Sequence, residues 1–311
     1  MKASAFQSFG APEVVQLIEL PVPTPAAGEI VVRVAASTVN PTDLMMRSGQ
    51  QAGLMKDLKP PYIAGMEFAG RVHATSDSQR LRVGQAVMGI VNPRRPQGGA
   101  HAEYVCVPEA SLAALPEGSD LVAACTVPMN GLTARMALEA LGLAPGAILL
   151  VTGGAGAVGG YVISLARLAR LRVVADAKES DRELLQSLGA ALIVPRGEGT
   201  AAGVHERHPD GVDAVVDCAL LGDPAAALVR SGGVFVSLRR SQVVTDSRLR
   251  LITIGVLDQV TNTPALEWLA QRFADGTLKP RIAQQLPAAR AAEAHRLVEQ
   301  GGLRGRVVLV F

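Results

Sequence analysis

The feature of this 311-residue sequence that most constrains its fold is a glycine-rich segment between two apolar stretches. Residues 154–159 read G-A-G-A-V-G, which fits the pattern G-x-G-x-x-G. The apolar run 147–151 predicts a buried parallel strand, and apolar residues at helical spacing in 161–168 predict a helix. A strand, this glycine pattern and a helix, in that order, indicate a dinucleotide-binding turn.

Each glycine of the pattern has a predicted role. Gly154 allows a tight turn, Gly156 lets backbone amides approach a diphosphate, and Gly159 lets the helix pack close to the strand. The amides at the start of the helix, with its positive dipole end, face the phosphates. The alternative is a glycine-rich turn that binds nothing. We favour cofactor binding by Gly154, Gly156, Ala157, Val158 and Gly159.

The charge, cysteine content and hydropathy of the chain exclude several classes of protein and partner. The formal net charge is +2 and the basic residues are scattered, which argues against nucleic acid or an anionic membrane as a partner. Three widely spaced cysteines without a C-x-x-C motif fit the reducing cytoplasm. Residues 146–166 carry no charge, but glycines interrupt them, so we predict strand, turn and helix rather than a membrane span. The N-terminus shows no apolar signal segment, and we expect a cytoplasmic protein.

The secondary-structure pattern changes along the chain. Up to about residue 120, short strand-like runs alternate with glycine and proline, which is typical of a barrel-like β domain. From about residue 125, strands alternate with helices, which predicts a doubly wound parallel sheet. The final stretch mixes helices with a last strand at 306–311.

Seven short motifs occur in a characteristic order, at residues 39–43 (VNPTD), 65–70 (GMEFAG), 83–87 (VGQAV), 99–104 (GAHAEY), 131–134 (GLTA), 154–159 (GAGAVG) and 276–280 (GTLKP). In their order and spacing, the chain resembles the zinc-free quinone oxidoreductase branch of the medium-chain dehydrogenase/reductase superfamily. The resemblance implies an α/β fold with a GroES-like β-barrel catalytic domain and a Rossmann doubly wound parallel sheet.

The resemblance also implies how the domains and the oligomer are organised. Residues 1–121 and 259–311 would form the catalytic domain, and residues 122–258 the Rossmann dinucleotide-binding domain. A homodimer would form by pairing of the edge strand near residues 250–257 across a two-fold axis.

The resemblance bears on the metal as well. Zinc-dependent relatives place their ligands where this chain has Asn40, Met66 and Met129. An amide and two thioethers are poor zinc ligands, and the five histidines show no ligand spacing. His205 and His208 are close in sequence, but we expect them in an exposed charged loop. We therefore predict no metal.

The nucleotide is predicted from the end of the second Rossmann strand, where an acid about twenty residues after the glycines would bind the ribose of NAD. Ala177 or Lys178 stands there, while Asp176 should point to the other face. A cation there suits the 2′-phosphate of NADPH, and the clamp candidates are Lys178, Arg182 and Arg196. The alternative is that these are surface charges and Asp176 reaches the ribose.

Further cofactor contacts follow from the resemblance. It places Thr133 near the nicotinamide, although a helix-start hydroxyl is nearly as good an interpretation. It places two pairs that each follow a sheet strand along the ribose and nicotinamide edge: Cys218 with Ala219, and Ser237 with Leu238.

The predicted activity is hydride transfer to a small electrophilic acceptor. Without a Lewis acid the protein suits acceptors that are already electron-poor, with quinones first. Asn40 and Asn130 could donate an amide hydrogen bond to the developing negative charge, and Tyr62 is a possible acid, although packing is its more common role. The alternatives are an enal, enone or enoyl-thioester reductase, and a sensor or structural protein that binds NADPH without turnover.

Overall fold

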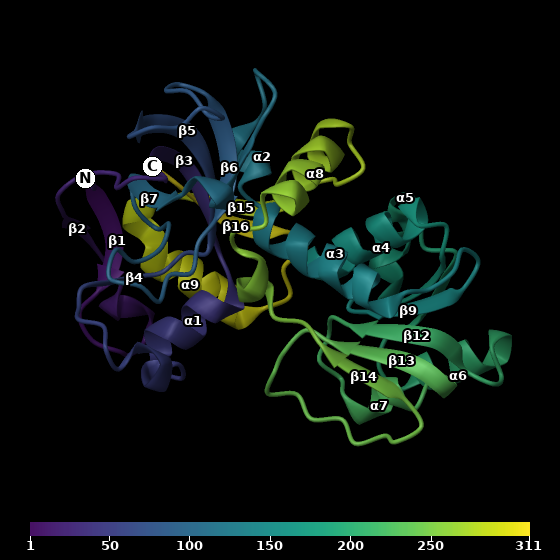
Figure 1. Cartoon of the computed structure of the whole chain (residues 1–311). Coiled ribbons are helices and arrows are strands. Elements are labelled where there is room, and N and C mark those ends of the chain that lie inside the picture. Colours follow the sequence, from purple (N-terminus) through teal and green to yellow (C-terminus); the bar gives the residue numbers. More distant parts are fainter. The chain divides into compact units, whose positions relative to one another are not determined.

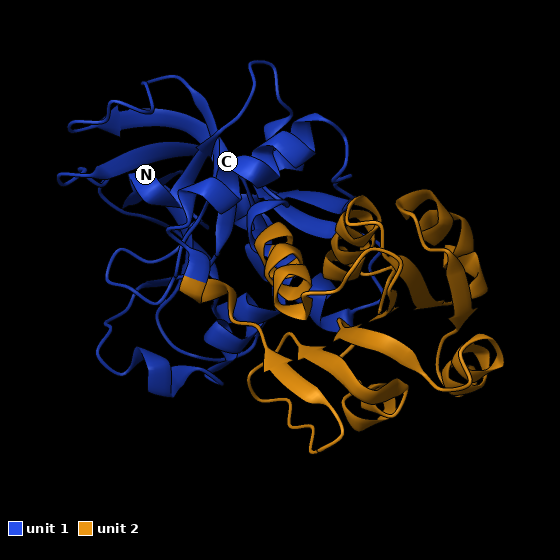
Figure 2. Cartoon of the chain, turned by 45° about the vertical axis from the view of Figure 1, so that its right-hand side comes forward, with its two compact units in different colours: residues 1–129, 259–311 blue, residues 130–258 orange.

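The computed structural model describes all 311 residues, which fold into two compact units. Unit 1 comprises residues 1–129 and 259–311, and unit 2 comprises residues 130–258. Both chain ends lie in unit 1, and unit 2 is one continuous insertion in it (Figure 2). The expected order of a β-rich segment, an alternating segment and a mixed C-terminal segment is thus present.

Unit 1 is organised around one long strand, β3 (Glu29–Val39), which pairs antiparallel with β16 (Arg306–Val310), β5 (Glu67–Thr75) and β7 (Tyr104–Pro108). The other strands of the unit are β1 (Lys2–Phe6), β2 (Gln16–Glu19), β4 (Tyr62–Ile63), β6 (Ala86–Ile90), β8 (Leu112–Ala114) and β15 (Ile282–Pro287). This arrangement confirms the GroES-like domain. The register sets Thr38 opposite Val308, and Ser37 opposite Phe68, so the start of β5 and the start of β16 meet near the end of β3.

The helices of unit 1 are α1 (Pro41–Ser48), α2 (Leu121–Ala124), α8 (Thr263–Ala274) and α9 (Ala291–Gln300). Two larger apolar clusters and a smaller one around Ala3 and Ile63 hold the unit together. One lies within the main sheet and includes Ile30, Phe68 and Val87. The other large cluster joins α1 and α9 to β16 and includes Met46 and Leu309.

Unit 2 is a six-stranded sheet in the order β11-β10-β9-β12-β13-β14, and every neighbouring pair is parallel. The strands are β9 (Ile148–Thr152), β10 (Arg172–Ala177), β11 (Leu192–Pro195), β12 (Val212–Asp217), β13 (Val229–Ser237) and β14 (Arg250–Thr253). The helices are α3 (Pro128–Leu141, from the last residues of unit 1), α4 (Ala157–Leu168), α5 (Arg182–Leu188), α6 (Gly199–Arg207) and α7 (Asp223–Ala226). Helices α4 and α7 lie on opposite faces of the sheet (Figure 1), which confirms the doubly wound fold.

The structure corrects one local expectation and confirms another. His205 lies in helix α6 rather than in a loop, although it is exposed as expected, and His208 lies in the connection directly after this helix. Only Thr200 and Val204 of this helix are buried, so its apolar pattern is too sparse to predict. The segment 146–166 is β9, a turn and the start of α4, and no helix of the structure is both long and apolar enough to cross a bilayer.

Candidate functional site

The glycine turn of unit 2 begins directly after β9. Gly153 has φ of +62°, a left-handed conformation that favours glycine. Gly156 is the N-cap of α4, and its amide donates to the Gly153 carbonyl over 2.8 Å. The reversal therefore falls on Gly153, one residue before the pattern from which we predicted it at Gly154.

The third glycine of the pattern is required by a close backbone approach. A Cβ at Gly159 would lie 2.4 Å from the Gly153 carbonyl oxygen and 2.9 Å from the Gly154 Cα. Because both obstacles are backbone atoms, no side-chain movement can relieve the clash. The predicted close packing of helix on turn is present.

The start of α4 has the chemistry of an anion site. No acidic residue lies in its first turn, and no side chain caps it. The first amides of a helix lack intrahelical partners, and the dipole adds positive potential there. The turn thus fits the diphosphate of a dinucleotide through its backbone, with Ala157, Val158 and Gly159 supplying the first helical amides.

The ends of β10 and β11 lie side by side next to this turn. The amide of Arg196 donates to the Ala177 carbonyl over 3.0 Å, which sets Arg196 beside the exposed Lys178. Asp176 is buried and accepts a hydrogen bond from the Gly153 amide. Its other oxygen lies 3.7 Å from Arg196 Nε, and burial raises the pKa of the Asp176 carboxyl.

Arg182, the third predicted clamp residue, has an acidic partner on its own segment. Its Nε donates to Glu179 over 2.6 Å, and its Nη2 over 3.0 Å. The two cations without such a bidentate partner are Lys178 and Arg196.

Side chains join the carboxyl ends of β9, β12 and β13. Asp217 accepts from the Thr152 hydroxyl at 2.5 Å and from Gln242 Nε2 at 2.7 Å. Ser237 donates to Gln242 Oε1 over 2.6 Å, and the amide of Ala219 donates to Thr152 over 3.0 Å. The predicted residues Ala219 and Ser237 thus belong to one hydrogen-bonded rim.

The two remaining predicted rim residues, Cys218 and Leu238, are both half-buried. Cys218 follows β12, and burial raises the pKa of its thiol well above the usual range. Leu238 follows β13 and is half-buried. A thiol that stays protonated is a weak nucleophile, so the raised pKa of Cys218 argues against a covalent role.

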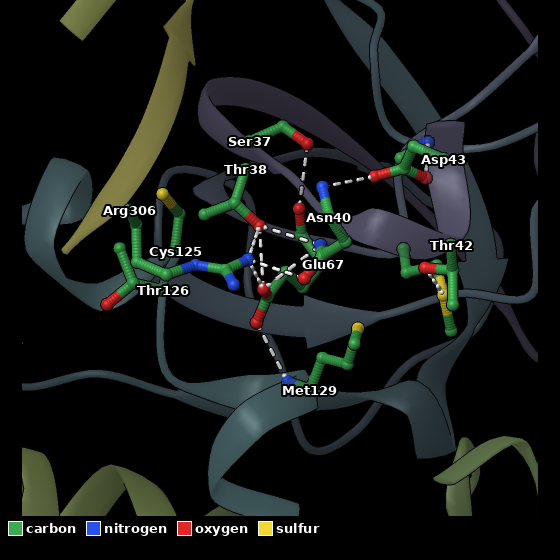
Figure 3. A network of polar contacts seen from close by, with 12 residues as sticks. Ser37, Thr38, Asn40, Thr42, Asp43, Glu67, Cys125, Thr126, Met129 and Arg306 are labelled. Atoms are coloured by element: carbon green, nitrogen blue, oxygen red, sulfur yellow. Dashed lines mark hydrogen bonds and ion pairs between the residues drawn. The ribbon is translucent and has the colours of Figure 1, made fainter. Parts of the chain in front are cut away.

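Unit 1 holds a buried polar network centred on Glu67, the first residue of β5 (Figure 3). Glu67 is fully buried, and its carboxylate accepts from the Thr38 hydroxyl at 2.6 Å and from Arg306 Nη2 at 2.7 Å. It also accepts from the Met129 amide at 2.8 Å, in the first turn of α3. A buried carboxylate needs such partners, because desolvation without them is costly.

Asn40 belongs to the same network. Its Oδ1 accepts from Arg306 Nη2 at 2.6 Å, and its Nδ2 donates to Thr38 over 3.1 Å and to Glu67 over 3.3 Å. Arg306 thus binds Asn40, one of the three positions where zinc-dependent relatives are expected to carry ligands, and Glu67, which directly follows the second of them, Met66. The sequence around Arg306 carries no signal for this role, because its partner Glu67 is 239 residues away.

The other predicted catalytic residues have different surroundings. Asn130 is 1% exposed, and its Nδ2 has no hydrogen-bond partner. The Tyr62 hydroxyl donates to the Leu58 carbonyl over 3.3 Å, and its ring stacks on Phe9 with centroids 5.5 Å apart. Thr133 is buried in α3. Of these residues, Asn130 has the amide donor that most needs a partner.

The protein groups no three side chains of the metal-ligating types His, Cys, Asp and Glu. Met66 Sδ accepts a hydrogen bond from the Thr42 hydroxyl at 3.1 Å, and the carboxylate of Glu67 is neutralised by Arg306.

Two family models match the chain: an alcohol dehydrogenase GroES-like domain over residues 26–117, and a zinc-binding dehydrogenase domain over residues 188–309. The 2-methylene-furan-3-one reductase of Solanum lycopersicum is 30% identical over 99% of this chain and 79% of its own length. The NADPH-dependent alkenal/one oxidoreductase of Arabidopsis thaliana is 29% identical, with the same coverage of both chains.

Among solved structures, the quinone oxidoreductase of Coxiella burnetii matches with a TM-score of 0.86 and 28% identity, covering 100% of this chain and 99% of that one. The chain therefore belongs to the quinone oxidoreductase branch of the medium-chain dehydrogenase/reductase superfamily. It is an oxidoreductase, and its relatives use a nicotinamide cofactor.

Proposed function

We propose that this protein is a zinc-independent, NADPH-dependent reductase of quinones or similar electrophilic acceptors. The observation that carries the proposal is the pairing of Glu67 with Arg306 and Asn40. The guanidinium is a permanent cation that already balances the buried carboxylate, so a metal ion there would meet a like charge. Without a Lewis acid, the suitable acceptors are those whose conjugation already makes them electrophilic.

The choice of NADPH is supported by the two cations at the ends of β10 and β11. Lys178 and Arg196 would hold the 2′-phosphate, and Arg182, already paired with Glu179, would contribute least. Asp176 is bound to the Gly153 amide, which turns its carboxylate toward the turn rather than toward a ribose. The Arabidopsis relative named for NADPH agrees with this choice.

In the proposed reaction, the bound nicotinamide supplies the hydride. The glycine turn and the amides of Ala157 and Val158 hold the diphosphate, and the rim residues Ala219 and Ser237 line the strand ends beside it. The Asn130 amide donates a hydrogen bond to the acceptor oxygen as negative charge develops there. Thr133, Cys218 and Leu238 complete the proposed cofactor contacts.

In unit 1, we assign Asn40 and Tyr62 to positioning rather than to proton transfer. Both ends of the Asn40 amide are engaged in the network, and the Tyr62 hydroxyl is bonded to a backbone carbonyl. Both side chains therefore fix the surroundings of the acceptor.

A second candidate function is reduction of enals and enones at the conjugated carbon. It is favoured by the names of the two plant relatives, a methylene-furanone reductase and an alkenal/one oxidoreductase. The same residues would serve, because the hydride acceptor is again a conjugated carbon whose charge develops on oxygen.

A homodimer is proposed through β14, the edge strand of the unit 2 sheet. This strand pairs only with β13, and Leu251 on it is 43% exposed. An unpaired strand edge is a template for addition of a strand from a second copy. Light scattering would test this arrangement on the native chain and on L251K.

The experiment for the proposed function is steady-state oxidation of NADPH and NADH, with a small quinone and with a conjugated enal. Turnover of the quinone with NADPH preferred, unchanged by a chelator, would support the first proposal. Preference for the enal would favour the second. Binding of NADPH without turnover of either acceptor would contradict both and favour a sensor.

A further inference from the structure

Arg94 lies in the loop that follows β6 and is half-buried there. Its amide donates to Asn92 Oδ1 over 3.1 Å, and its Nη1 donates to Gln51 Oε1 over 2.9 Å. Gln51 lies shortly after α1, so this one side chain joins the loop after α1 to the loop after β6.

The charge of Arg94 is not balanced by an acid of the protein. Its hydrogen bonds are to amide oxygens only, and it takes part in no ion pair. Burial lowers the pKa of its guanidinium, and no acidic neighbour offsets this. By contrast, the buried arginines Arg47 and Arg306 are paired with Glu299 and Glu67. A half-buried cation without a counter-charge is suited to bind an anion.

The free part of the guanidinium has a defined geometry. With Nη1 engaged by Gln51, the Nε and Nη2 donors remain, and these two lie along one edge of the planar group. That edge matches the two oxygens of a carboxylate in a bidentate pair. The neighbouring Arg95 has no such freedom, because its Nε and Nη2 donate to the carbonyls of Gly98 and Cys106.

The loop that carries Arg94 is anchored close to the residues that we assign to the surroundings of the acceptor. The loop begins at Val91, whose amide donates to the Met66 carbonyl over 2.7 Å. Met66 precedes Glu67 and contacts Thr42, which follows Asn40 in the first turn of α1. Arg94 thus lies on a loop anchored next to the polar network that we assign to the surroundings of the acceptor.

We propose that Arg94 binds a carboxylate carried by the acceptor, so that the substrates are conjugated carbonyl compounds with an acidic side chain. This inference rests on the proposed function, because it names the class of acceptor for the same reaction. Arg94 acts on binding and specificity, while the hydride transfer itself needs no charge from it.

The test uses two pairs of acceptors, each an acid and its methyl ester, and compares the acid-to-ester ratio of kcat/KM between the native protein and its variants, so that differences in intrinsic reactivity cancel. One pair is 4-carboxycinnamaldehyde and its methyl ester, and the other is 3-(1,4-naphthoquinon-2-yl)propanoic acid and its methyl ester. The native protein should prefer the acid of at least one pair by about tenfold in kcat/KM, the effect of a charge-assisted pair. R94Q should lose this preference, and R94K, which keeps charge but not the planar edge, should retain part of it.

Arg82 supplies the matched control, because it is an exposed arginine of the same unit without an ion pair. R82Q should keep the preference of the native protein. Equal rates for acid and ester in the native protein, or an equal loss for both in R94Q, would overturn the assignment of Arg94 and leave the proposed function standing.

A binding measurement separates failure of the chemistry from failure of this site. Calorimetry with NADP⁺ present would follow binding of each acid without turnover. If no acceptor is reduced, binding of an acid to the native protein but not to R94Q would still support the carboxylate site. If neither acid binds to the native protein, the assignment of Arg94 as a carboxylate site is overturned.

Discussion

The two candidate sites are built from different parts of the chain. The glycine turn of unit 2 offers backbone amides from one continuous segment, and its geometry depends on the absence of side chains at Gly153 and Gly159. The network of unit 1 joins side chains from β3, β5, β16 and the start of α1 with one backbone amide of α3, and Arg306 and Glu67 are separated by 239 residues. The first kind of site needs local conformation, whereas the second needs the whole unit to be folded.

The largest expected effect comes from breaking the network. R306M would leave the fully buried Glu67 carboxylate without its cation. We expect the free energy of unfolding of unit 1 to fall by about 3–5 kcal/mol, because an unpaired buried charge is costly. Trp268, the single tryptophan, lies in α8 of unit 1, so urea unfolding followed by its fluorescence measures the loss.

The double variant E67L/R306M sharpens this prediction. Apolar replacement of both partners should recover much of the stability, because no buried charge then remains. The exposed Arg82 is the control, and R82M should change stability by less than about 0.5 kcal/mol. If R306M were as mild as R82M, the network would not be a structural requirement of unit 1.

This contrast also explains which features could be predicted from the sequence. The turn was predictable because its strand, glycines and helix are contiguous, and only the residue with positive φ was misplaced, from Gly153 to Gly154. Arg306 was not predictable, because its partners come together only through the pairing of β16 with β3. Helix α6 was missed because only Thr200 and Val204 are buried.

The second prediction concerns the turn. In G159A, a Cβ would meet the Gly153 carbonyl oxygen at 2.4 Å, so the backbone must shift. We expect a destabilisation of about 1–3 kcal/mol, typical of overpacking. Binding of NADPH, measured by fluorescence titration, should weaken by at least about tenfold, which corresponds to about 1.4 kcal/mol.

Gly53 supplies the control for this change. An added Cβ there would meet no atom within 4 Å, so G53A should leave both stability and NADPH binding unchanged. Normal NADPH affinity in G159A would mean that the close approach of α4 to the turn is not needed for the cofactor.

The third prediction uses pH to distinguish the units. His295 in α9 is fully buried, and burial, with His101 and Arg47 nearby, lowers its pKa to about 3. An unfolded histidine titrates near about 6.5, so below that pH the unfolded chain binds a proton that the folded chain excludes. The free energy of unfolding is therefore unaffected by this histidine above about pH 6.5. As the pH falls to about 5, the free energy of unfolding should decrease by about 2 kcal/mol.

Urea unfolding at several pH values, again followed by Trp268 fluorescence, measures this slope for unit 1. H295Q removes the titrating group and should flatten the slope. His205, exposed on α6 of unit 2, is the control, and H205Q should retain it. An unchanged slope in H295Q would assign the acid sensitivity of unit 1 to other groups.

The smallest expected effect concerns the side chains that supplement the turn. Lys178 and Arg196 are exposed, so each should contribute only about 1 kcal/mol to binding of the 2′-phosphate, roughly fivefold in affinity. K178Q and R196Q should therefore raise the KM for NADPH and leave that for NADH unchanged. R182Q is the matched control, because Arg182 is already bound to Glu179.

An equal loss of affinity for both nucleotides in R196Q would show instead that Arg196 acts on the turn itself, through Asp176 and Gly153. The turn would then depend on side-chain contacts, as the network of unit 1 does. The two sites would differ only in how much of their geometry side chains determine.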